Sequence, residues 1–221
     1  MKRPAIVFDL DGTLVDSLPD IVASFRWAFG DVGLNAPAEA AVRAQVGLPL
    51  EAMFARFAPH DAVAALAAAY RRHYPLHCAD RTRPFPGVPE LLATLREHGY
   101  ATAVATTKRS PMALQLVEAM GLTGAIDHVQ GTDGFAYKPA PDVVQRALAA
   151  LQAEGRWMVG DTTHDVGAGK AAGLRTYAVT WGTHDAATLR AASPDVLADD
   201  LQGLVPILLR AEPGGRGTIG A

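Results

Sequence analysis

From residue 86 onward the sequence alternates between apolar runs of strand length and amphipathic stretches of helix length. A short apolar run at residues 5–8, without polar alternation, predicts one further buried strand near the start of the chain. Strands that alternate with helices form a parallel sheet with helices on both faces. We therefore expect an α/β fold with a doubly wound parallel sheet. The other expected strands are residues 102–106, 126–130, 157–160 and 175–180, and the expected helices are residues 88–98, 110–120, 140–152, 164–172 and 201–209.

Residues 17–82 interrupt this alternation, because they contain alanine-rich helical patterns and no convincing strand. Ser17-Leu18-Pro19-Asp20 resembles a capping box at the start of a helix. We expect a core of residues 1–16 and 83–210 that carries an all-helical insertion, residues 17–82. The glycine-rich residues 211–221 lack a periodic apolar face and are expected to be disordered. Further helices of the insertion are expected at residues 38–46, 50–57 and 61–74, and residues 83–87 have the composition of the return linker.

Composition and charge argue against several classes of protein. The formal net charge is -3 and no Lys/Arg cluster is present, which argues against a nucleic-acid partner. Cys78 is the single cysteine, so an intrachain disulfide is impossible and a reducing compartment is favoured. No apolar run approaches the roughly 18 residues of a membrane span, and the run before Asp9 is too short for a signal-peptide core. We expect a cytoplasmic protein, with an oligomeric state that the sequence does not specify.

Two carboxylates stand where the first strand ends. Asp9 and Asp11 are two positions apart, and Gly12 follows them. Residues i and i+2 of a strand face the same side, and open α/β sheets bind ligands at the carboxyl ends of their strands. Two neighbouring carboxylates repel each other unless a cation or a shared proton offsets their charge. The pair predicts a metal site or an acid/base dyad, and the simpler alternative is a solvated turn.

Polar residues of a matching kind follow the other strands. Thr106 ends the second strand, Lys138 lies between the third strand and a helix, and Asp161 and Asp165 follow the fourth. Singly, each has an ordinary explanation: a strand-end hydroxyl, a surface lysine and a helix-capping pair. Together they predict a phosphoryl-transfer site, in which acids bind a hard cation and the lysine, hydroxyl and backbone N–H groups bind phosphoryl oxygens.

These four motifs together resemble those of the haloacid dehalogenase-like hydrolase superfamily. They are D-x-D-G-T from Asp9, the strand-end Thr106, K-P-x-P from Lys138 and G-D-x-x-x-D at residues 160–165. The resemblance covers residues 1 to about 183, and the helical insertion resembles the mobile cap of that family. Within the superfamily, the sequence most resembles the phosphoglycolate phosphatases. The resembling segments are V-D-S at residues 15–17, V-G-L-P at residues 46–49, the linker at residues 83–87 and W-G at residues 181–182.

The resemblance implies a Mg²⁺-dependent phosphomonoester hydrolase that acts on a small phosphorylated metabolite. By motif, Asp9 would attack phosphorus and form an aspartyl-phosphate intermediate. Asp11 would protonate the leaving oxygen and then take a proton from the hydrolytic water. Thr106 and Lys138 would hold the phosphoryl oxygens. The implied metal ligands are Asp9, the Asp11 carbonyl and Asp161, with Asp165 in support.

The resemblance makes 2-phosphoglycolate the leading substrate, and the insertion offers Arg43 and Arg56 as partners for its carboxylate, although surface solvation explains each arginine as well. Thr107 stands where relatives often have Asn or Ser, so contacts there stay open. A phosphosugar mutase of the β-phosphoglucomutase kind, or a sugar phosphatase, would differ mainly in cap contacts. A phospho-accepting receiver domain is the alternative from another class, but residues 130–131 supply no acceptor acid and receivers lack a seventy-residue insertion.

Overall fold

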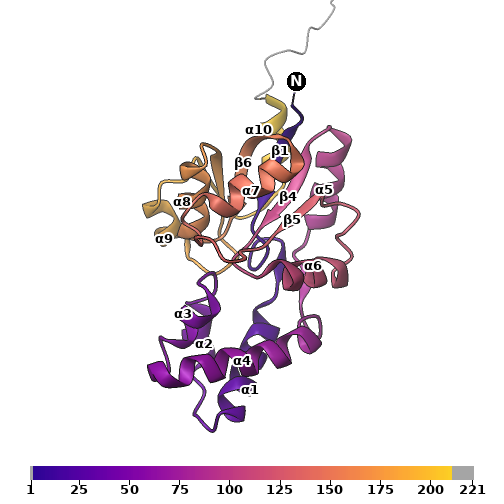
Figure 1. Ribbon diagram of the computed structural model, residues 1–221. Coiled ribbons are helices and arrows are strands. Elements are labelled where there is room, and N and C mark those ends of the chain that lie inside the picture. Colours follow the sequence, from indigo (N-terminus) through magenta and orange to yellow (C-terminus); the bar gives the residue numbers. More distant parts are fainter. Residues whose placement is uncertain (1, 211–221) are drawn as a thin grey trace, which may run out of the picture.

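The computed structural model describes residues 2–210 and has two parts, an α/β core and a helical insertion that lies below it in Figure 1. The predicted disordered tail, residues 211–221, lies outside the described residues. Within residues 2–210, no helix has the length and the apolar character that crossing a bilayer requires.

The core is built on a six-stranded sheet in the order β5-β4-β1-β6-β7-β8, and every neighbouring pair is parallel. The chain moves from β1 to one edge of the sheet and then crosses back from β5 to β6. This reversal beside β1 is a topological switch point, where open α/β sheets bind their ligands. The predicted doubly wound parallel sheet is confirmed. Its strands are β1 (Pro4–Phe8), β4 (Ala101–Ala105), β5 (His128–Gln130), β6 (Glu154–Gly160), β7 (Arg175–Val179) and β8 (Val196–Ala198).

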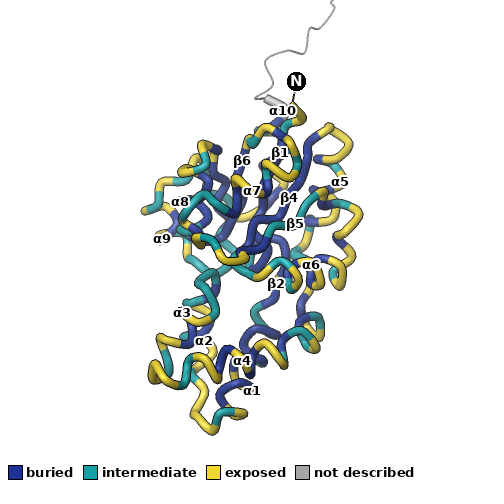
Figure 2. Tube along the Cα trace, viewed as in Figure 1, coloured by how far each residue is buried: buried dark blue, intermediate teal, exposed yellow. Residues whose placement is uncertain are grey.

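Helices cover both faces of this sheet, which is why the central strands are buried in Figure 2. Ile6 and Phe8 of β1 point into the core shared with α5 and α6, whereas Val7 points to the opposite face, toward α7. A central strand is therefore apolar at every position rather than at alternate ones. The helices are α5 (Val88–Glu97), α6 (Ser110–Ala119) and α10 (Leu204–Arg210) on one face, and α7 (Asp142–Leu151), α8 (Thr163–Ala171) and α9 (Ala186–Ala191) on the other.

Two elements of the core were not expected from the sequence, α9 and β8. Each is too short to show a periodic pattern, and β8 is a three-residue edge strand. Strand β6 also begins at Glu154 rather than at residue 157. Glu154 and Arg156 are exposed, so the polar start of this strand hides its apolar pattern.

The insertion contains helices only, as expected, but their lengths differ from the expected ones. An aromatic cluster holds them together, in which the ring of Phe25 stacks on that of Phe54 with centroids 4.1 Å apart. Helix α4 continues beyond Tyr74, because Pro75 lies near its end and removes a single backbone donor. The helices are α1 (Leu18–Asp31), α2 (Glu39–Arg43), α3 (Leu50–Phe54) and α4 (His60–His77).

A small antiparallel sheet joins the insertion to the core. It pairs β2 (Val15–Asp16) with β3 (Arg83–Pro84), so the outgoing and returning connections lie side by side. The predicted capping box at residues 17–20 is wrong, because Ser17 makes no side-chain cap bond and donates its hydroxyl to Asp11 instead. Asp20 is used across the junction, where it accepts the backbone N–H and the hydroxyl of Thr82, both at 2.8 Å.

Candidate active site

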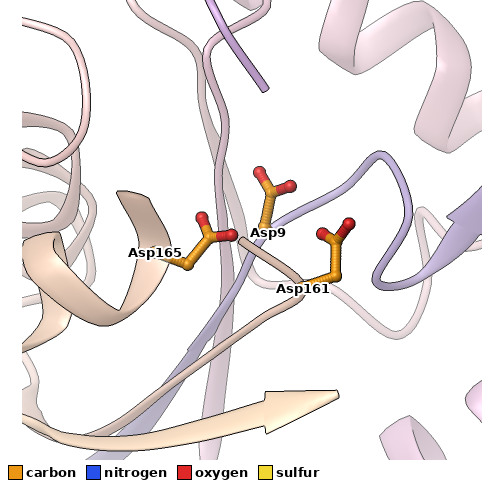
Figure 3. Close-up of side chains that lie close together, drawn as sticks. All are labelled: Asp9, Asp161 and Asp165. Carbon is orange, nitrogen blue, oxygen red and sulfur yellow. The ribbon is translucent and has the colours of Figure 1, made fainter. Parts of the chain in front are cut away.

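Three carboxylates converge at the carboxyl end of the central strands. Asp9 follows β1, Asp161 follows β6 and Asp165 lies in the first turn of α8. Figure 3 shows their side chains close together, with the carboxylates on the same side, and each offers an oxygen within 4.8 Å of the others. All three are buried. The structure thus brings together three of the four acids selected from the sequence.

Lys138 is buried against these acids. Its Nζ lies 2.6 Å from Asp9 Oδ1 and 2.6 Å from Asp165 Oδ1, and it donates to the Ala105 carbonyl at 3.0 Å. Burial alone would lower the pKa of this lysine, but Asp165 and Asp9 outweigh burial, and the pKa of Lys138 is raised. The ammonium is therefore a permanent cation at the centre of the site.

One lysine does not neutralise three buried carboxylates. Burial raises the pKa of Asp9 well above its ordinary value; Lys138 lowers it, and Asp165 and Asp161 raise it further. Burial and Asp165 raise the pKa of Asp161 to about 6. Clustered carboxylates of this kind are relieved by a cation, and carboxylate oxygens suit a hard divalent one. The donor set and its excess negative charge therefore fit a metal site.

Asp161 is held rigidly in this cluster. Its Oδ1 accepts the Thr13 hydroxyl at 2.8 Å, and its Oδ2 accepts the Thr183 backbone N–H at 2.7 Å. Glycines flank it closely: a Cβ would lie 2.4 Å from Asp161 Oδ2 at Gly12, where φ is +83°, and 2.2 Å from it at Gly182. Any side chain at either glycine would displace the carboxylate.

Asp165 serves two purposes. Its Oδ2 accepts the backbone N–H of Thr162 at 2.9 Å, and its own backbone N–H donates to the Thr162 hydroxyl oxygen at 3.3 Å, which together form a capping box at the start of α8. Its Oδ1 pairs with Lys138. Helix capping, the ordinary explanation for this acid, is thus correct for one oxygen and leaves the other for the site.

Asp11 does not join the carboxylate cluster. Its Oδ1 accepts the Ser17 hydroxyl, and its Oδ2 lies 2.9 Å from Lys108 Nζ. The side chain borders the cavity between the core and the insertion. Any metal contact from this residue is left to its main-chain carbonyl, whereas its carboxylate faces the space available to a ligand.

Thr106 is buried at the end of β4, the place predicted for it. Its hydroxyl accepts the Lys108 backbone N–H at 3.3 Å, and among residues 2–210 it makes no hydrogen bond to the acids selected from the sequence. The neighbouring Thr107 lines the cavity. The structure places both hydroxyls beside the site without bonding either of them to it.

A cavity of about 700 Å³ separates the core from the insertion. Leu48, Met53 and Tyr70 line it from the insertion, and Asp11 and Lys108 line it from the core. Its size is that of a small-molecule site, and its lining combines apolar side chains with polar and charged ones. The two arginines suggested for a substrate carboxylate lie elsewhere: Arg43 donates to the Gly182 carbonyl at 3.3 Å and borders a separate small cavity, and Arg56 is exposed.

A model of the family described as haloacid dehalogenase-like hydrolase matches residues 6–179. The chain belongs to the haloacid dehalogenase-like hydrolases. This hydrolase is 39% identical over 212 residues to the protein named "Probable phosphatase IndB" of Dickeya dadantii, with 92% of each chain covered. It is 37% identical to a phosphoglycolate phosphatase of Mesorhizobium japonicum, covering 84% of this chain and 86% of that one.

Among solved structures, a haloacid dehalogenase-like family hydrolase from Streptococcus pneumoniae superposes with a TM-score of 0.85 at 30% identity, covering 94% of this hydrolase and 98% of that chain. These relatives identify the protein as a phosphatase enzyme that resembles the phosphoglycolate phosphatases. The receiver-domain alternative is thereby excluded.

Sequence reasoning missed several residues of the hydrolase site. Thr13 and Ser17 lie in the quoted D-x-D-G-T and V-D-S motifs but were given no contact in the site, because a hydroxyl beside an acid is common in any loop. Tyr74 reaches the site only through the packing of α4 over the core, where its ring lies 4.7 Å from Lys108 Nζ. Lys108 carried a usable signal, since it is one of four lysines in the chain and stands at the end of a strand.

Proposed function

We propose that this hydrolase is a Mg²⁺-dependent phosphomonoesterase with Asp9 as the nucleophile and Asp11 as the acid and base. The observation that carries the proposal is the different surroundings of these two carboxylates. Asp9 lies in the buried cluster with Lys138, whereas Asp11 turns toward the cavity. Two acids in different surroundings can take two different roles in one reaction.

The reaction would proceed in two displacements. An Asp9 oxygen attacks phosphorus, the bond from phosphorus to the ester oxygen breaks, and Asp11 gives its proton to that oxygen. Water then attacks the phosphorus of the aspartyl phosphate, Asp11 takes a proton from the water, the bond from phosphorus to the Asp9 oxygen breaks, and inorganic phosphate leaves the free Asp9 carboxylate. Lys138 offsets the charge of the phosphoryl oxygens, and Thr106 and the backbone N–H groups of Leu10 and Asp11 complete their binding, since the Gly12 N–H already donates to the Val15 carbonyl.

Asp9, Asp161, Asp165 and the Asp11 carbonyl would hold Mg²⁺, which when bound supplies positive charge at the phosphoryl oxygens. Thr13 and the Thr183 N–H prepare this site by fixing both oxygens of Asp161.

The helical insertion is proposed to be a cap that closes over the substrate. Residues 17–82 form the cap in this proposal, and residues 1–16 and 83–210 form the catalytic core. Support comes from the paired connections β2 and β3 and from two contacts between the insertion and the core: Gln115 donates to the Pro75 carbonyl at 2.6 Å, and Arg43 donates to the Gly182 carbonyl. A cytoplasmic location, proposed on the single cysteine, suits an enzyme of this kind.

Removal of divalent cations is expected to stop phosphate release, and Mg²⁺ is expected to stabilise the fold. The pKa of Asp161 is raised from 3.8 to about 6 in the native state. Between these two pH values, the native protein therefore keeps a proton on Asp161 that the unfolded chain has lost. The free energy of unfolding of the metal-free protein should therefore fall as pH rises from about 4 to about 6, and the whole of this loss is present above that range. Mg²⁺ at about 100 times its Kd for the native state would add about 2.7 kcal/mol to the free energy of unfolding.

Thermal unfolding with and without Mg²⁺ measures this effect, and the rise in Tm should be larger at pH 7.5 than at pH 5. Asp161→Asn should lose most of that rise, whereas Asp61→Asn, which changes an exposed acid of α4, should keep it. Full activity after exhaustive chelation, or a Tm that ignores Mg²⁺ at pH 7.5, contradicts the metal proposal.

The proposed substrate is 2-phosphoglycolate, supported by the phosphoglycolate phosphatase relative and by the partly buried cation Lys108 in the cavity. The cavity is larger than a two-carbon acid requires, so sugar phosphates and mutase substrates belong in the same screen. We expect kcat/KM for 2-phosphoglycolate to exceed that for hexose phosphates and nucleotides by at least about tenfold, roughly 1.4 kcal/mol in transition-state binding. A flat profile or a preference for a hexose phosphate overturns this choice and leaves the phosphatase chemistry intact.

A further inference from the structure

Lys108 is a partly buried cation at the core end of the cavity, and the reaction described above does not use it. It belongs to the loop that follows β4, and its side chain is 13% exposed. Its Nζ lies 2.9 Å from Asp11 Oδ2 and 4.7 Å from the centroid of the Tyr74 ring. The ammonium is thus held between the acid of the core and an aromatic face of the insertion.

The other cations near the cavity are already engaged or exposed. Lys138 is enclosed by the carboxylate cluster, and Arg71 of α4 pairs with Glu51. Arg109 lies on the cavity wall with a side chain that is 70% exposed. Of the cations lining the cavity in the described part of the chain, Lys108 is the one that touches Asp11.

Its position relative to Asp11 decides which part of a substrate it meets. In the proposed reaction, the ester oxygen of the leaving group must come within hydrogen-bond reach of Asp11, about 3 Å. Lys108 Nζ lies at a similar distance from the same carboxylate. Because Lys108 and Asp11 both line the cavity, a leaving group whose ester oxygen meets Asp11 would bring its next atoms within reach of the ammonium.

The ammonium also has capacity for a further acceptor. A lysine carries three donors, and in residues 2–210 this one has a single ion pair, to Asp11. The Tyr74 ring can hold such a cation in place without neutralising it.

We propose that Lys108 determines specificity by binding a carboxylate carried by the leaving group next to the ester oxygen, with Tyr74 as the residue that positions the ammonium. The inference rests on the proposed function, and it gives the substrate class as small phosphomonoesters of 2-hydroxy acids, of which 2-phosphoglycolate is the simplest. Selectivity then arises because an ester with a neutral leaving group offers the ammonium no anionic partner besides Asp11. Apolar insertion residues such as Leu48 and Met53 shape the remainder of the cavity.

The test compares two esters that differ chiefly at one group, 2-phosphoglycolate and 2-hydroxyethyl phosphate. The wild-type enzyme should favour 2-phosphoglycolate by at least about tenfold in kcat/KM. Lys108→Met should raise KM for 2-phosphoglycolate at least about tenfold while kcat changes less than about threefold, and 2-hydroxyethyl phosphate should be almost unaffected. Lys108→Arg should restore much of the preference, and Lys170→Met, which removes an exposed lysine of α8, should leave both esters unchanged.

Each outcome distinguishes this inference from the function on which it rests. An equal loss for the two esters in Lys108→Met assigns the lysine to the support of Asp11 and overturns the specificity role. Absence of discrimination by the wild-type enzyme overturns it as well and needs no variant to fold. If the wild-type protein with Mg²⁺ releases phosphate from neither ester nor from p-nitrophenyl phosphate, the phosphatase mechanism itself fails.

Discussion

Asp9→Asn should release no measurable phosphate while the protein remains folded. The amide has nearly the shape of the carboxylate but is not a nucleophile, so the first displacement cannot begin. The fold should tolerate the change, because burial already raises the pKa of Asp9 and Lys138 keeps its second partner, Asp165. Continuous phosphate release and thermal unfolding, measured on the same preparation, test both halves of this expectation.

The aspartyl phosphate offers a second measurement that depends on the same residue. Acid quenching during turnover of a labelled substrate should leave label on the wild-type chain and none on Asp9→Asn. Asp61→Asn makes the same chemical change at an exposed position of the insertion and should behave as the wild type. Phosphate release at the wild-type rate by folded Asp9→Asn assigns the nucleophile to another group.

The carboxylate cluster could be found from the sequence because topology alone brings it together. Asp9 and Asp161 follow strands that are neighbours in the sheet, and the ends of parallel strands meet at one edge. Lys138 lies in the connection between the edge strand β5 and α7, and its side chain reaches Asp9 in the same cluster. To place such residues together, it is enough to know that the strands are parallel and where each one ends. The alternation of strands and helices in the sequence indicates both.

Contacts between the insertion and the core could not be found in this way. Ser17 and Asp20 have the spacing of a capping box, yet each bonds to a residue brought near by the junction of β2 and β3. Tyr74 and Lys108 meet only because α4 packs over the loop after β4. No local pattern records which partner a polar side chain selects when several lie within reach, so these contacts required the structure.

The same limit applies to the candidates for carboxylate binding. Arg43 and Arg56 were selected because they are cations of the insertion, but the charge of a residue and the domain that contains it do not show where its side chain points. Arg43 points to the Gly182 carbonyl beside Asp161 and helps to hold the insertion against the core. The lysine that does face the cavity belongs to the core, two residues beyond the strand-end Thr106.

Asp11→Asn should lower kcat for alkyl phosphates by about 10²–10⁴, the usual contribution of a general acid and base. The carboxylate is the group that borders the cavity, so it is placed to meet the ester oxygen. The loss should shrink for p-nitrophenyl phosphate, since nitrophenolate leaves without protonation. Steady-state rates across a series of esters of graded leaving-group pKa measure this dependence.

The two contacts of Asp11 provide a control for its role. Ser17→Ala removes the hydroxyl donor and keeps the carboxylate, so it should cost far less than Asp11→Asn and should keep the wild-type dependence on leaving-group pKa. In Asp11→Asn that dependence should become steeper, because every leaving group must then depart unprotonated. An equal loss for alkyl and nitrophenyl esters removes the acid role from Asp11; its carboxylate would then serve mainly to hold Lys108 at the mouth of the site.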